Sequence, residues 1–158
     1  MADARFEDGD ERPLNLFAQD GDDLGVISAL VQDSVLPVTE MTWDRKARRF
    51  VALINRFRWE DRAAAEAAKR PVERVRALLT VSDVLAVRTQ GIDRQDRDTV
   101  LSILSLTWEP GMDGTGRLVL VLAGDGAVAV EVEALDVSLR DVTRPYRAPS
   151  GKVPSHDL

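Results

Sequence analysis

The chain has 158 residues, of which 44% are hydrophobic and 30% are charged, and its formal net charge is −6. This composition is typical of a globular chain rather than a disordered one, and the length suits one domain. The sequence contains no cysteine. That absence excludes a disulfide framework, a thiolate nucleophile, an iron–sulfur cluster and a zinc–thiolate site.

The first twelve residues are acidic and polar and have no hydrophobic periodicity. We expect residues 1–12 to form a disordered leader, followed by a single α+β domain over residues 13–142 and an extended tail over residues 143–158. The leader lacks the apolar segment of a signal peptide. The longest apolar run, Leu118–Ala123, is far shorter than the ~20 residues of a membrane helix. We therefore expect a cytoplasmic protein that is not inserted in a membrane.

An amphipathic helix is predicted over residues 21–34, preceded by a short strand over residues 13–18. Asp20 is suited to the N-cap position, and the acidic residues after it face the positive end of the helix dipole. The helix should end before Pro37, because the residue before a proline is disfavoured in helical conformation. One apolar face follows at helical spacing, formed by Leu24, Ile27, Leu30 and Val31.

Beyond Pro37 the hydrophobic period changes from that of a helix to that of a strand. Residues 38–43 and 49–59 are predicted to form a hairpin around the polar turn 44–48. The second strand is apolar on both faces at its start and carries arginines near its end. We expect it to be buried on both faces at first and half-exposed at its end.

Strands dominate the rest of the chain. Residues 60–72 are rich in alanine and charge, and we interpret them as a surface excursion or mobile loop. Residues 135–139 continue the alternation after a phase slip, as a bulged strand would, and a short helix extending to Val142 is the alternative. Turn residues separate five further strands, at residues 74–81, 84–90, 100–108, 117–123 and 127–133.

These elements predict an α+β fold. Sequential hairpins give an antiparallel sheet, and a sheet of this many strands usually curls, splits or closes. We expect a curved antiparallel sheet or partial barrel of seven to eight hairpin-connected strands, with one N-terminal helix packed on it.

Few residues suggest catalysis. His156 is the single histidine, and it lies in the tail, where side chains rarely receive the packing that a catalytic triad needs. Asp93, Asp96 and Asp98 are spaced like the start of a calcium loop, but the central glycine and closing glutamate are absent. We therefore predict no catalytic residue, no metal and no cofactor. A non-enzymatic binding domain is the leading hypothesis, and an enzyme with an unrecognised Asp, Glu or Arg site is the alternative.

The best candidate surface is a stripe of arginine and aromatic residues on the strand 49–59. Guanidinium groups stack on aromatic rings and pair with phosphate or carboxylate. Phe50 and Phe57 are expected in the core, Trp43 largely buried beside the turn, and Trp59 partly exposed where the strand leaves the sheet. The predicted binding residues are Arg49, Arg56, Arg58, Trp59 and Arg94.

Charge is distributed unevenly along the chain. Residues 1–44 carry a net charge of −9, residues 45–76 carry +7 and the remainder carries −4. We expect the basic segment to pair with acidic residues, within the chain or across a dimer, so the predicted partner is a protein or a second copy. A nucleic-acid-binding module using residues 45–76 is less favoured, because the net negative charge repels a polyanion.

Several stretches resemble a known family. They are residues 23–33 (DLGVISALVQD), 48–60 (RRFVALINRFRWE), 91–94 (GIDR), 100–104 (VLSIL) and 152–157 (KVPSHD). Over about residues 13–157 the chain resembles an alphaproteobacterial family known as domain of unknown function 2948. The resemblance implies a bacterial, cytosolic, single-domain protein. It implies no activity and no cofactor, and it carries no functional residue over to this chain.

Overall fold

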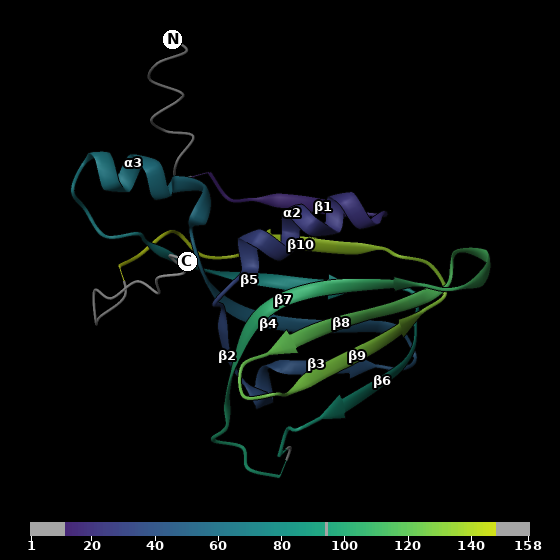
Figure 1. Cartoon of the computed structure of the whole chain (residues 1–158). Helices are drawn as coiled ribbons and strands as arrows, with labels where there is room; N and C mark the ends of the chain where they lie inside the picture. Colours follow the sequence, from purple (N-terminus) through teal and green to yellow (C-terminus); the bar gives the residue numbers. More distant parts are fainter. Residues whose placement is uncertain (1–11, 94, 148–158) are drawn as a thin grey trace.

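The computed structural model describes residues 12–93 and 95–147. Within these residues, ten strands form one open antiparallel sheet, accompanied by two α-helices (Figure 1). The helices are α2 (Gly21–Val31) and α3 (Arg62–Ala67), and short 3-10 turns lie at η1 (Val38–Glu40), η2 (Trp59–Asp61) and η3 (Met112–Gly114). The strands are β1 (Asn15–Ala18), β2 (Val35–Pro37), β3 (Met41–Asp44), β4 (Arg49–Phe57), β5 (Arg74–Val81), β6 (Val84–Gln90), β7 (Val100–Pro110), β8 (Gly116–Leu122), β9 (Ala127–Val132) and β10 (Val137–Asp141).

The α+β class agrees with the prediction, whereas the predicted seven to eight strands and single helix are too few. Strand β2 has three residues and ends at a proline, so it is too short to show a period. Helix α3 buries a single side chain, Ala65, and therefore has no apolar face that a sequence pattern could reveal. Residues 137–141 form a strand, and the alternative of a helix through Val142 is wrong.

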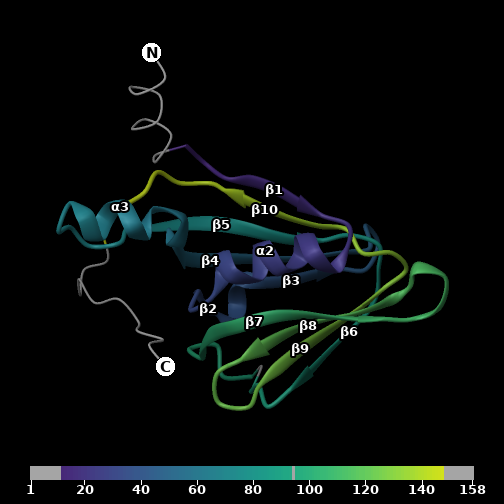
Figure 2. The same ribbon diagram turned by 45° about the horizontal axis from the view of Figure 1, so that its top comes forward.

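The sheet consists of two halves joined by β2. Along the sheet the order is β1-β10-β5-β4-β2-β7-β8-β9-β6, and β3 pairs with β4 beside this path. Strand β2 pairs with β7 at three positions but with β4 only at Val35, which is opposite Asn55. Because so few residues join the halves, the sheet bends at β2 and its two parts diverge (Figure 2).

Helix α2 packs inside the bend, along β7 and beside β1 (Figures 1 and 2). Its N-cap is Asp20, as predicted, and the Asp20 carboxylate accepts a hydrogen bond from the Asp23 N–H at 2.8 Å. The helix buries Leu24, Ile27 and Val31 in the core. This apolar face draws the two halves of the sheet around one hydrophobic core.

Two openings remain in the sheet. The first lies on one side of β4, where Leu53 and Ile54 have no strand partner because β3 stops pairing at Ala52 and β2 pairs at Asn55. The second lies between the edge strands β3 and β6. The start of β6 meets the turn between β3 and β4, where the Val84 N–H donates to the Arg48 carbonyl at 2.9 Å. No helix in the described part of the chain is long and apolar enough to cross a membrane.

Candidate functional site

Arg56, near the end of β4, is predicted from the sequence to bind a ligand, but all its hydrogen-bond donors are bonded within the protein. Arg56 is 0% exposed. Its Nε and Nη2 donate to the two carboxylate oxygens of Asp141 at 3.0 and 2.9 Å. Its Nη1 and Nη2 donate to the two oxygens of Glu60 at 2.9 and 2.8 Å, and Nη1 also donates to the Phe57 carbonyl at 3.0 Å. A guanidinium has five N–H donors, so Arg56 has none left for a ligand.

The charges of this cluster reinforce one another. Burial alone would lower the pKa of Arg56, but the hydrogen bonds and charges of Glu60 and Asp141 outweigh it and raise that pKa. Burial is likewise the largest single influence on Glu60 and acts to raise its pKa, but the hydrogen bond and charge of Arg56, with smaller contributions from a backbone hydrogen bond and from Arg58, together lower it. Both groups are therefore held in their charged forms, as a completed buried ion pair requires.

A second ion cluster follows at the chain's turn into α3. Arg58 is buried and lies 3.4 Å from Asp61 and 3.2 Å from Glu73. Arg70 reaches the same Asp61 carboxylate at 2.8 Å. These ion pairs hold the segment of residues 60–73 against the end of β4. Phe57, Ala65 and Val72 form a small separate apolar cluster there.

The expectation that the end of β4 is half-exposed is therefore wrong. Residues 56–58 are all buried, because the following excursion folds back over them and supplies their acidic partners. Phe50 and Phe57 lie in apolar clusters, as predicted. Trp59 is partly exposed, as predicted, and its Nε1 donates to the Gln32 carbonyl at 2.8 Å. Trp43 is half-buried rather than largely buried.

The structure does not gather the predicted binding residues into one site. Arg49 lies exposed at the opposite end of β4 from Arg56 and Arg58. Arg94 and His156 lie outside the described residues, as do the leader up to residue 11 and the tail from residue 148.

An unexpected surface lies on the outer face of β4 and β5. Alternation along β4 places Ala52 and Ile54 in the core and places Val51 and Leu53 on the opposite face, where both are half-buried. Leu53 is directly opposite Leu78 of β5, and no described helix packs over this pair, because α2 lies in the core and α3 covers only the end at Phe57. We call this surface the outer face.

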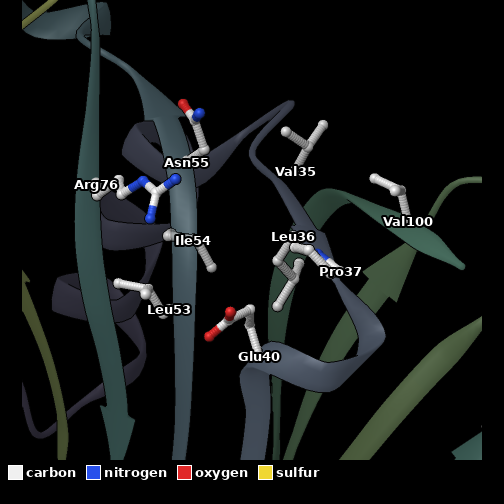
Figure 3. Close-up of a pocket in the computed structure, with 9 residues that line it drawn as sticks. All are labelled: Val35, Leu36, Pro37, Glu40, Leu53, Ile54, Asn55, Arg76 and Val100. Atoms are coloured by element: carbon white, nitrogen blue, oxygen red, sulfur yellow. The ribbon is translucent and has the colours of Figure 1, made fainter. Parts of the chain in front are cut away.

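A hollow of about 270 Å³ opens in the outer face at the first gap of the sheet (Figure 3). Val35, Pro37 and Val100 form an apolar wall on the β2 side, and Val100 is 63% exposed. Arg76 of β5 and Glu40 of η1 reach toward the hollow from different sides (Figure 3). Neither Arg76 nor Glu40 forms an ion pair with another described residue.

One comparison with known proteins gives a match. A family model described as a protein of unknown function, DUF2948, matches residues 14–156. The chain belongs to this family. The match confirms the family resemblance that the sequence motifs indicate. No curated protein and no solved structure matches the chain.

In this DUF2948 chain, the outer face is an apolar surface with a hollow at the first gap of the sheet. Its hollow combines one guanidinium and one carboxylate with aliphatic walls. Within the described residues, no group of three or more histidine, aspartate or glutamate side chains is placed to hold a metal ion. Sequence reasoning missed this surface, although the apolar residues on both faces of β4 were its signal.

Proposed function

We propose that the chain is a non-enzymatic interaction domain that associates through its outer face, and that its partner is a second copy of the chain. The observation that carries this proposal is that β4 is apolar on both sides, while the residues that the structure describes cover only one of them. Beside the apolar hollow lie a guanidinium and a carboxylate that form no ion pair with another described residue.

The apolar character of the outer face supports association. An antiparallel sheet with one solvated face normally alternates apolar and polar residues. Strand β4 instead places Val51 and Leu53 on its outer side, next to Leu78 of β5. Contiguous apolar surface of this kind, rimmed by polar groups, is typical of interaction sites.

The two unpaired charges support a copy of the same chain as the partner. In a two-fold symmetric dimer, each residue of the interface meets its complement twice. Arg76 of one copy would face Glu40 of the other, and the reciprocal pair would form on the far side of the axis. One chain therefore supplies both halves of a charge-complementary interface.

Sedimentation velocity over the micromolar range tests the proposal. We expect a dimer for the unchanged chain and a monomer for Leu53→Asp, which would bury an unpaired charge in the interface. Arg88→Glu is the matched control, because Arg88 is exposed on the other half of the sheet. Circular dichroism of each variant confirms that it is folded.

Charge reversal gives a test that is specific for self-association. Arg76→Glu alone and Glu40→Arg alone should each be monomeric, because like charges brought together across an interface cost several kcal/mol. Mixing the two variants should restore a dimer, since every contact in that heterodimer joins opposite charges.

Two results would sink the proposal. One is that the full chain is a strict monomer at all concentrations. This result counts against the proposal even if a chain shortened after Arg147 forms a dimer, because residues 148–158 would then be the occupant of the outer face. The other is a dimer whose stability does not change on charge reversal.

A further inference from the structure

The second opening of the sheet forms a hollow of about 350 Å³ between the edge strands β3 and β6, which we call the slot. Ligand sites in proteins occupy roughly 300–1,000 Å³ and often lie at the mouths of barrel-like sheets. The slot is lined by none of the residues that line the hollow in the outer face. It therefore forms a separate site.

The floor of the slot is the hydrophobic core itself. Phe50 of β4 and Val128 of β9 are buried core residues that also line the slot. Half-buried Trp43 of β3 and Val87 of β6 stand on its two sides. An apolar group placed here would be removed from water on several sides, which favours its binding.

Two arginines line the slot, and both are exposed, whereas Arg56 is buried. The guanidinium carbon of Arg45 lies 4.5 Å from the centre of the Trp43 ring, and Arg97 enters from the loop before β7. Neither Arg45 nor Arg97 forms an ion pair or side-chain hydrogen bond with another described residue. Their donors are therefore available for an anionic group, which a guanidinium binds through paired N–H groups.

The Trp43 side chain lines the slot with its ring and not with its donor. Its Nε1 atom is buried and has no hydrogen-bond partner within the described part of the chain. Buried donors in proteins are nearly always paired, and this one is closed to water, so it does not reach the open space of the slot. Trp59, in contrast, donates its Nε1–H to the Gln32 carbonyl.

We propose that the slot binds a small organic carboxylate that has an aliphatic or aromatic body. The carboxylate pairs with Arg45 and Arg97, while the body rests on Phe50 and Val128. The site is independent of self-association, because the outer face supplies none of its residues.

Titration calorimetry with octanoate and with octanol tests the proposal, since the two probes share a chain length and differ in charge. We expect octanoate to bind at least tenfold more tightly than octanol. Arg45→Gln and Arg97→Gln should each weaken octanoate binding about tenfold, the effect of losing one charge-assisted hydrogen bond. The affinity for octanol should change by less than about twofold.

Arg88→Gln is the matched control. Arg88 lies on β6 between Val87 and Thr89, which both line the slot, but its own side chain points to the other face and is 73% exposed. The Arg88→Gln substitution removes one positive charge, as the other two substitutions do, but it does not change the slot. Octanoate binding should therefore be unchanged.

Three results would overturn the proposal. They are the absence of octanoate binding, equal affinities for octanoate and octanol, and octanoate binding that survives both arginine substitutions. Each is distinguishable from failure of the self-association proposal, which is read from sedimentation of the ligand-free chain.

Discussion

On the inward face of β4, the buried positions from Phe50 to Ile54 are apolar (the apolar end), and the next one, Arg56, is charged (the ionic end). Ile54 and Arg56 are successive inward positions, and they are 1% and 0% exposed. Ile54 packs against apolar neighbours in the core. Arg56 instead donates five hydrogen bonds, to the carboxylates of Asp141 and Glu60 and to the Phe57 carbonyl. Equal burial thus rests on two different physical bases. The apolar end depends on area removed from water, and the ionic end depends on every partner being present.

The largest effect is expected at the ionic end. Asp141→Ala removes two hydrogen bonds from the Arg56 guanidinium and the acceptor of the Leu14 N–H. Breaking one partner of a buried ion pair typically costs about 3–5 kcal/mol, and we expect that loss in urea unfolding. The double variant Arg56→Met with Asp141→Leu should lose clearly less, because it leaves no buried charge behind. A smaller loss for Asp141→Ala than for the double variant would break the comparison.

The apolar end should respond more moderately and in proportion to volume. Ile54→Ala should lower the free energy of unfolding by about 2–4 kcal/mol, and Ile54→Val by about 1 kcal/mol. Both losses should be the same at acidic and neutral pH, because no titrating group is involved. A pH-dependent loss at Ile54 would show that the two ends are energetically coupled.

Glu60 should make the ionic end sensitive to acid. Its pKa is lower in the folded protein than the ordinary value of 4.5, because the hydrogen bond and charge of Arg56, with smaller contributions, together outweigh the effect of burial. The stabilisation is therefore fully present above about pH 4.5 and is lost as the pH falls through the folded-state value. Glu60→Gln should cost about 1–2 kcal/mol at neutral pH and should flatten the acid limb of the stability curve. An unchanged acid limb would contradict this role.

The smallest effect compares two tryptophans. Trp59→Phe removes the hydrogen bond from Nε1 to the Gln32 carbonyl and should cost about 1 kcal/mol beyond the change in ring size. Trp43→Phe removes a donor that has no partner among the described residues, so it should cost less. Urea midpoints of the two variants measure the difference. Equal losses would mean that the Trp43 donor is already satisfied in the free protein.

Much of the fold could be predicted because its signals are local. The Asp20 cap and the spacing of Leu24, Ile27 and Val31 identify α2, and alternation between turns identifies the strands from β5 to β9. The helix predicted over residues 21–34 is three residues too long, since the chain leaves helical geometry at Gln32.

The sites could not be predicted in the same way because their partners are distant in sequence. Arg56 meets Asp141 across 85 positions, and no periodic pattern distinguishes a paired arginine from a free one. The slot joins β3 to β6 across the break in the sheet, so it appears only once the strand order is known. Its one local signal was the closeness of Trp43 and Arg45 in sequence, which suits cation–π stacking.

The position of β10 also has a consequence for synthesis on the ribosome. Strand β5 pairs with β10 through residues 77–81, and β10 begins at Val137, long after β5 has emerged. Until then one edge of β5 is open to other nascent chains, Arg56 lacks one of its two carboxylates, and β1 has no strand to join. Translation of a single late strand thus completes the sheet edge and neutralises the buried charge together. Chains that stall before residue 137 should therefore be the aggregation-prone species.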